Sequence, residues 1–187
     1  MSVDQFTLSR LWLLVGTLTL LIALPFGASA KGKFPEATQT QIDAALAKLA
    51  TWAADADVVA AVKSANASPN AGMTNGKWVE LDNDAAEVTA ITSSPLSQQL
   101  GAWKSESGLN KLFLRSQEGV LVAGAAKPLV YNVKKRKPFK NAIKGQPWHA
   151  GKAKPDPTTQ IKSVQISVPV KDGADVIGVL HSSVIVP

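Results

Sequence analysis

The chain has 187 residues, of which 45% are hydrophobic and 18% are charged, and its formal net charge is +6. This length predicts a single domain with enough apolar side chains to form a core. The absence of cysteine excludes a disulfide framework, a thiolate metal site and a cysteine nucleophile.

The N-terminus has the pattern of a secretory signal peptide. Arg10 precedes an apolar run over residues 11–24, which is short for a membrane span. The small residues Ala28-Ser29-Ala30 then form a cleavage site, and no cysteine follows to carry a lipid. We therefore predict a signal peptide over residues 1–30, cleaved near its last alanine, and one periplasmic or secreted domain over residues 31–187 without a membrane span. An uncleaved N-terminal anchor is the alternative.

Two helices are predicted next. Thr38 and Gln41 match a capping box that would open an alanine-rich helix. The apolar residues of this helix recur at spacings of three and four and form a single stripe: Ile42, Leu46, Leu49 and Trp52. Asp55 or Asp57 can cap a second helix, which Ser68-Pro69-Asn70 would stop. The stripe is narrow and lacks a basic polar face, so we expect the first helix to lie on a sheet and not on a membrane.

Shorter helices are expected before the first strand. A turn-rich link over residues 70–77 leads to Asp82-Asn83-Asp84, which can cap a short helix that extends through Ile91. Ser94-Pro95 opens another helix, with proline at its first position, and Gly108 ends it. Three tryptophans of these predicted helices and the link between them are interpreted as core residues: Trp52, Trp78 and Trp103.

The strands follow in the second half. Residues 111–115 and 120–124 read as a hairpin with Gly119 in its turn, and Trp148-His149 opens a third strand. The most strongly patterned stretch comes last, where two β-branched runs flank Lys171-Asp172-Gly173. The first run alternates apolar and polar residues, as a half-buried strand does, with apolar positions at Val164, Ile166, Val168 and Val170. The second run is apolar on both parities and predicts an interior strand covered on two faces.

Helices followed by antiparallel strands predict an α+β fold. The chain resembles the extracytoplasmic sensor domains of the Cache type, also called PDC, which are related to the PAS fold. The most specific matching segments are residues 113–123, 145–148, 164–170 and 177–180. It is particularly similar to the solitary periplasmic members, which have a signal peptide and one sensor unit without an output domain.

This resemblance implies a long N-terminal helix packed on one face of a five-stranded antiparallel sheet, with a small-molecule pocket on the other face. It also implies signal transduction through a separate membrane-bound partner. Two departures matter for the ligand. Ser116 stands where many members have aspartate, and the pocket loop over residues 131–144 is purely basic. A small anionic or carboxylate ligand is therefore expected in place of a cationic amino group.

The positive charge is concentrated in one segment. Residues 125–154 contain nine basic residues and no acidic residue. This segment can be a solvated loop, a pocket wall that pairs with a carboxylate, or a surface patch for polyanions. For the pocket interpretation, the candidate ligand-binding residues are Tyr131, Lys134, Arg136, Lys137, Trp148 and His149.

Catalysis has little support in the sequence. The only two histidines, His149 and His181, stand far apart, without the spacing of a metal site or of a catalytic triad. No glycine-rich phosphate loop is present, and only Tyr131 and Phe139 interleave with the basic residues, so no cofactor, metal or nucleic acid is expected. We expect an exported small-molecule-binding sensor domain that is not an enzyme; the alternative is a polyanion-binding or interaction protein that uses residues 127–154.

Overall fold

The computed structural model describes residues 34–69 and 72–187. The predicted signal peptide lies outside these residues, so its cleavage stays a prediction. Within the described ranges, no helix has both the length and the apolar character needed to cross a membrane.

The elements follow the predicted order, with helices first and most strands after them. The helices are α1 Glu36–Ala53, α2 Ala56–Ala67, α3 Asn75–Glu80, α4 Ala86–Thr92, α5 Pro95–Ser107 and α6 Lys137–Ala142. The strands are β1 Leu109–Ser116, β2 Leu121–Gly124, β3 Trp148–His149, β4 Lys154–Pro155, β5 Lys162–Asp172 and β6 Asp175–Ile185.

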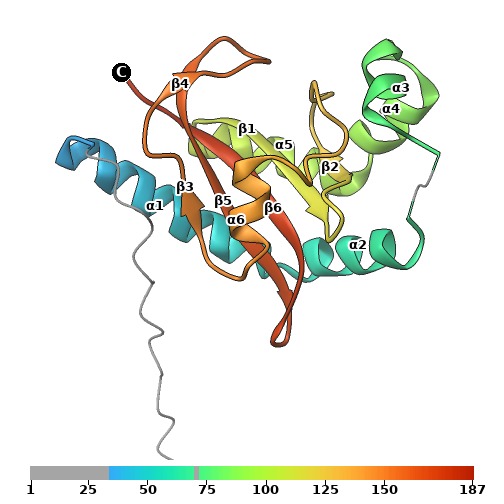
Figure 1. Cartoon of the computed structure of the whole chain (residues 1–187), viewed down its shortest axis with the longest axis horizontal. Coiled ribbons are helices and arrows are strands. Elements are labelled where there is room, and N and C mark those ends of the chain that lie inside the picture. The colour runs from blue at the N-terminus through green and yellow to red at the C-terminus, as the bar shows by residue number, and fades with distance from the viewer. Residues whose placement is uncertain (1–33, 70–71) are drawn as a thin grey trace, which may run out of the picture.

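An antiparallel sheet forms the centre of the molecule (Figure 1). Five strands follow the order β2-β1-β6-β5-β3, and the two-residue strand β4 also pairs with β5. The predicted α+β architecture with an antiparallel sheet is therefore confirmed, and the sheet has six strands where five were predicted. The sequence did not indicate β4, because its two residues carry no period.

The hairpin of β5 and β6 has the predicted turn. Asp172 pairs with Asp175, and Gly173 adopts a φ of 60°, which residues with a side chain rarely adopt. Strand β6 lies between β1 and β5 and is buried on both faces over most of its length. Its apolar character on both parities follows from this interior position.

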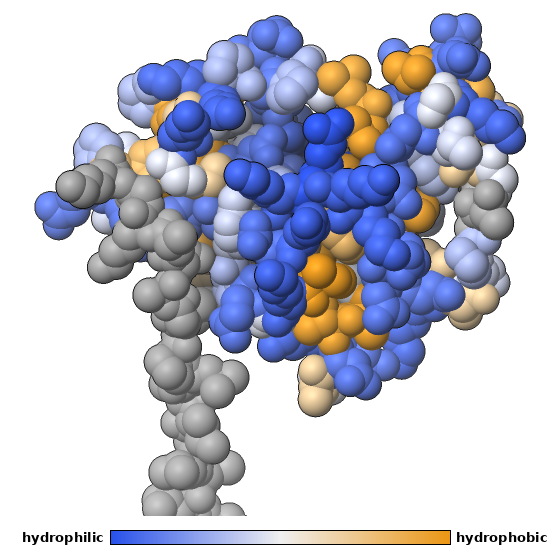
Figure 2. Space-filling model, in the orientation of Figure 1, coloured by the Kyte–Doolittle hydropathy of each residue, from blue (hydrophilic) through white to orange (hydrophobic). Residues whose placement is uncertain are grey.

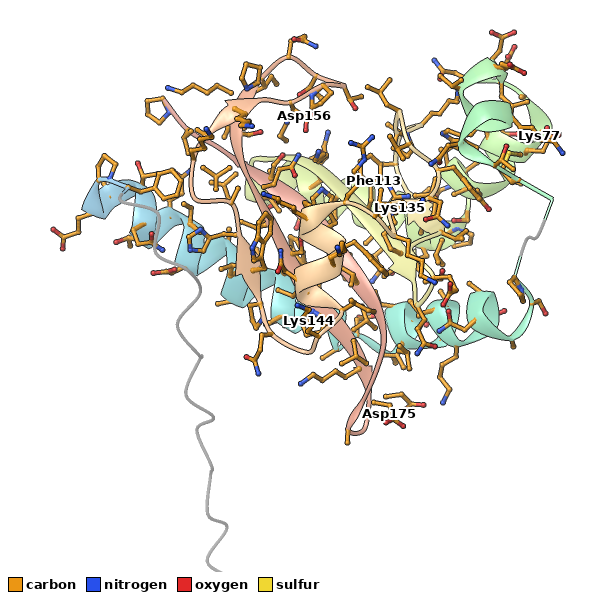
Figure 3. All side chains as sticks on the ribbon, in the orientation of Figure 1. Lys77, Phe113, Lys135, Lys144, Asp156 and Asp175 are labelled. Carbon is orange, nitrogen blue, oxygen red and sulfur yellow. The ribbon has the colours of Figure 1, made fainter. Side chains whose placement is uncertain are left out.

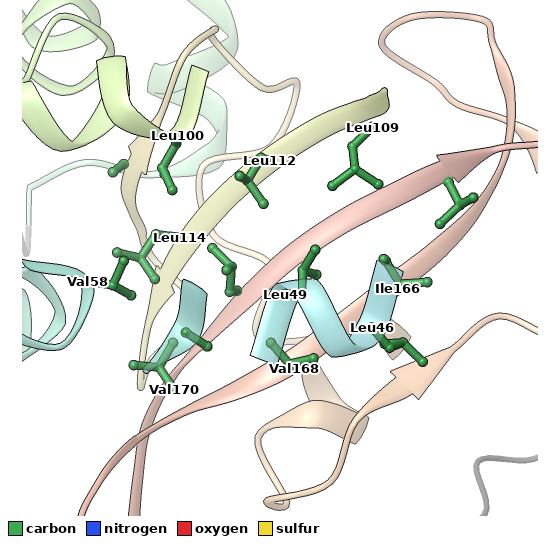
Figure 4. Close-up of a cluster of buried hydrophobic side chains, with 14 of the residues drawn as sticks. Leu46, Leu49, Val58, Leu100, Leu109, Leu112, Leu114, Ile166, Val168 and Val170 are labelled. Carbon is green, nitrogen blue, oxygen red and sulfur yellow. The ribbon is translucent and has the colours of Figure 1, made fainter. Parts of the chain in front are cut away.

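The helical layer covers one face of this sheet. The four alternating residues of β5 all lie in the main core cluster with Ile42, Leu46 and Leu49 of α1: Val164, Ile166, Val168 and Val170 (Figure 4). Helix α2 packs close to β6 at Gly178, where a Cβ atom would lie 2.8 Å from Cγ1 of Val62. The interior face of β5 that was predicted from its alternation is therefore the face that α1 covers.

Several helix ends agree with the prediction. The Asp55 side chain accepts hydrogen bonds from the amides of Asp57 and Val58 at 2.9 and 3.4 Å, and so caps α2. Ser94 accepts from the Ser97 amide at the start of α5, and Gly108 ends α5 with a φ of 66°.

Other helix ends differ from the prediction. Helix α1 begins at Glu36 after Pro35, so the predicted capping box at Thr38 is wrong. Glu36 and Ala37 are good helix formers, and an acidic residue is favourable in the first turn, so the helix extends back to the proline. Helix α4 begins after Ala85 and not at the aspartates over residues 82–84. Helix α3 replaces part of the link predicted over residues 70–77.

The tryptophans lie in the core or at its margin. Trp78 is fully buried, and its indole donates a hydrogen bond of 2.7 Å to the carbonyl of Pro128. Trp52 and Trp103 stack with parallel rings 5.0 Å apart, and so join α1 to α5 at the margin. The interpretation as a core residue is therefore confirmed for Trp78, whereas Trp52 and Trp103 are half-buried and pack against the core.

Candidate ligand-binding site

A cavity of about 320 Å³ opens on the face of the sheet opposite α1. Its floor consists of β-strand side chains that point away from the helical layer: Lys111, Phe113, Arg115, Gln165, Val179 and His181. Its wall is the crossover segment, defined here as residues 128–139, which follows β2 and includes the first turn of α6. Pro157 and Thr158 complete the lining. The alternation of strand residues therefore places the hydrophobic core and the cavity on opposite faces of the same strands.

Arg115 carries a charge into the interior. This residue of β1 is 2% exposed, although its side chain lines the cavity. Its Nη1 donates hydrogen bonds to the carbonyls of Tyr131 at 2.7 Å and of Val130 at 3.3 Å. Its Nε has no hydrogen-bond partner, and no described carboxylate forms an ion pair with the guanidinium. The guanidinium carbon also lies 5.4 Å from the centre of the Phe113 ring, so the contacts described for this charge are with neutral groups.

The guanidinium stays charged in this position. Burial lowers the pKa of Arg115 to about 9, against a smaller opposite effect of Tyr131. Because this pKa lies above neutral pH, Arg115 is a cation under ordinary conditions. A buried cation without an anion is costly, and a bound anion would relieve that cost.

The second cation of the floor is already neutralised. Lys111 forms an ion pair with Asp156, whose side chain is 0% exposed and lies in the loop that follows β4 (Figure 3). Asp156 also accepts hydrogen bonds from the amides of Thr158 and Thr159. Burial acts to raise the pKa of Asp156, but the hydrogen bond and charge of Lys111, with the two amides, hold it below its usual value. Asp156 is therefore ionised, and its carboxylate is already bound by Lys111 and by two backbone amides.

His181 contributes an uncharged imidazole. Burial first, and then the charges of Lys111 and Arg115, lower the pKa of His181 well below 6.5. Its Nδ1 lies 3.2 Å from the hydroxyl oxygen of Ser167, within hydrogen-bond distance. At neutral pH the ring can therefore donate or accept a hydrogen bond without adding charge.

The structure brings two of the six predicted site residues to the cavity. Arg136 and Lys137 line its edge and are exposed. Lys134 instead pairs with Glu118 at the surface, outside the lining. Figure 2 shows hydrophilic side chains gathered over this part of the surface.

The other three predicted residues do not reach the cavity either. Tyr131 is buried beside Trp78, with ring centroids 5.1 Å apart, and contributes its carbonyl to Arg115. His149 is buried, and its ring lies 6.2 Å from that of Phe34, which packs on the main core. Trp148 pairs with Ser167 in the sheet and is outside the lining. Of the six candidate residues, only Arg136 and Lys137 therefore line the cavity.

The floor residues were missed by the sequence reasoning: Lys111, Arg115, Gln165 and His181. One signal was present, since Lys111, Phe113 and Arg115 alternate with Leu112 and Leu114 along β1. Two basic residues at alternate positions of a mostly apolar strand point to the same face of the sheet, and they indicate a polar site on that face.

No protein-family model and no curated protein matches the chain. Solved sensor domains do match it. The V. cholerae histidine kinase DctB sensor domain is 15% identical with a TM-score of 0.43, and the match covers 80% of this chain and 57% of that chain. The ligand-binding domain of the Campylobacter jejuni chemoreceptor Tlp3, in complex with L-valine, is 12% identical with a TM-score of 0.42 and covers 82% of this chain and 65% of that chain.

The E. coli DcuS sensor domain is a third match, 12% identical with a TM-score of 0.39; the match covers 55% of this chain and 78% of that chain. The first of these neighbours is the sensor domain of a histidine kinase, the second is the ligand-binding domain of a chemoreceptor and the third is a sensor domain. The chain spans about 57% and 65% of the first two neighbours.

The groups in the cavity can bind an anion. Its lining combines one buried cation, one lysine paired with Asp156, two exposed cations and a neutral imidazole with apolar wall residues. Among the described residues, no group of three histidine, aspartate or glutamate side chains could hold a metal ion. A guanidinium beside an apolar wall suits a carboxylate, because it can donate two parallel hydrogen bonds to the two oxygens.

Proposed function

We propose that this chain is an extracytoplasmic sensor domain that binds a small carboxylate in the cavity between the sheet and the crossover segment. The observation that supports this most strongly is Arg115, a buried guanidinium that no described carboxylate neutralises. Ligand pockets are commonly apolar cavities of this size with a few polar groups that fix orientation. In this proposal, Arg115 is the group that fixes the carboxylate.

In this proposal, the ligand signal passes to a separate membrane-bound partner. The crossover segment is the natural relay, because its carbonyls at residues 130 and 131 already hold Arg115. A bound carboxylate would compete for the same guanidinium and change the position of this segment.

The test is calorimetric titration of the purified protein with benzoate, pyruvate, succinate and 4-methylpentanoate in 0.15 M salt. We expect one-to-one binding of at least one acid, and a loss of about 30-fold or more in Arg115→Met, because truncating one partner of a buried charge pair costs about 2–5 kcal/mol. Lys140→Met is the matched control, since Lys140 is exposed and lies outside the cavity lining.

A surface polyanion function is the second candidate, since Lys135, Lys140 and Lys144 are exposed and form no ion pair with a described residue. Heparin binding that salt abolishes, together with no binding of any small acid, would favour this candidate and refute the cavity proposal.

A further inference from the structure

The charges that line the cavity all have one sign. Its lining contains four basic residues, Lys111, Arg115, Arg136 and Lys137, and no aspartate or glutamate among the residues that the structure describes. A carboxylate entering this cavity meets only complementary charge. A ligand ammonium group would meet only charge of its own sign.

The nearest acid cannot serve as an ammonium acceptor. Asp156 is absent from the described lining, its side chain is 0% exposed, and it is occupied by Lys111 and by the amides of Thr158 and Thr159. Turning it toward a ligand would break three polar interactions and leave Lys111 unpaired. The remaining acceptors of the lining, such as Gln165, are neutral and share the cavity with the Arg115 cation.

The rest of the lining favours an apolar ligand body. Phe113, Val133, Phe139 and Val179 line the space between the floor and the crossover segment. Phe139 and Val179 also pack together in a core cluster, which fixes their positions. The cavity of about 320 Å³ corresponds to about ten water molecules, each with a share of about 30 Å³. An acid with a branched or aromatic body of about ten non-hydrogen atoms matches this volume.

We infer that the cavity selects carboxylates that have an apolar body and no amino group, and that it discriminates against amino acids of the same carbon skeleton. This inference rests on the proposed function and names its ligand class. The carboxylate lies on Arg115, and the body lies against Phe139 and Val179. An amino group beside the carboxylate would lie close to the Arg115 cation and would find no carboxylate in the described lining.

Matched pairs of compounds test this selectivity directly. 4-Methylpentanoate and L-leucine share a carbon skeleton and differ by the α-ammonium group, as do 3-phenylpropanoate and L-phenylalanine. Calorimetric titration at pH 7.5 in 0.15 M salt is expected to show that each acid binds at least tenfold more tightly than its amino acid.

A charge-introducing variant provides the second readout. Gln165→Glu changes the shape of a floor residue little and places a carboxylate in the cavity. We expect it to weaken 4-methylpentanoate binding and to reduce or reverse the preference over L-leucine. Gln146→Glu is the control, since Gln146 is exposed and outside the lining, and it should leave the preference unchanged.

The outcomes separate the two proposals. Equal or tighter binding of the amino acids overturns the inference and leaves the carboxylate-binding function intact. An unchanged preference in a folded Gln165→Glu variant also overturns it. If neither pair binds and none of benzoate, pyruvate and succinate binds either, the proposed function fails, and the inference fails with it.

Discussion

In the proposed site, Arg115 would serve ligand binding at the expense of folding. Its guanidinium is buried, lacks a described carboxylate partner and has an unpaired Nε. Two backbone carbonyls replace only part of its hydration. Such a group persists where function requires it, because an apolar side chain of similar length would be easier to bury.

Arg115→Met should therefore stabilise the ligand-free protein. We expect the free energy of unfolding to rise by about 1 kcal/mol or more, in the range found when buried charges are replaced by apolar side chains. Urea denaturation at pH 7 measures this change, with Lys140→Met as a surface control expected to stay within about 0.5 kcal/mol. A loss of more than about 1 kcal/mol would instead show that the two hydrogen bonds outweigh the cost of the buried charge.

The candidate site was only partly predictable at this scale. Arg136 and Lys137 belong to a run of charge that is visible in the sequence, and both line the cavity. Arg115, by contrast, stands in a mostly apolar strand, and its place in the sequence does not show that it lines a cavity. Its proposed role depends on which face of β1 the helices cover, and on the crossover segment that lies over the other face. Neither is a local property of the sequence.

At the scale of elements, hydrophobic periodicity predicted more than helix-end signals did. The stripe of α1 and the alternation of β5 meet in the core, and both patterns follow from burial over many residues. The capping box at Thr38 depended on two residues, and Glu36 and Ala37 extended the helix past it. Signals carried by one or two residues are easily overridden by their neighbours.

Leu49→Ala tests the packing of α1 on the sheet. Leu49 is 0% exposed in the main core cluster, so we expect a loss of about 2–5 kcal/mol in the free energy of unfolding. Lys48→Ala, one residue earlier on the exposed face of the same helix, should cost less than about 0.5 kcal/mol. Chemical denaturation of both variants gives the comparison. Similar small losses in the two variants would contradict the packing described for α1.

At the scale of the whole molecule, the excess positive charge lies on one side of the cavity. Arg136 and Lys137 line the cavity, and three more exposed basic residues lie in the crossover segment, in α6 and just after α6: Lys135, Lys140 and Lys144. Such an arrangement attracts anions over a distance and raises the rate of association more than the lifetime of the complex.

The association rate of an anionic ligand should therefore depend on this surface. Replacing Lys135, Lys140 and Lys144 by glutamine is expected to slow association severalfold at low salt and to leave dissociation nearly unchanged, because none of the three lines the cavity. In 0.15 M salt, where the Debye length is about 8 Å, the difference should shrink. Stopped-flow tryptophan fluorescence measures both rates. A change confined to dissociation would show that these lysines contact the ligand directly.

The position of β6 has a consequence for how the chain is made. Strand β6 is synthesised after all the other strands, yet it is the interior strand that joins β1 to β5. Its pairing of Leu112 with Ser182 spans about 70 residues, so the core under α1 cannot close until β6 leaves the ribosome. A nascent chain that stops before residue 175 exposes the edges of β1 and β5 together, and unpaired edges template aggregation. Completion of this sheet therefore depends on β6, the last of the six described strands to be synthesised.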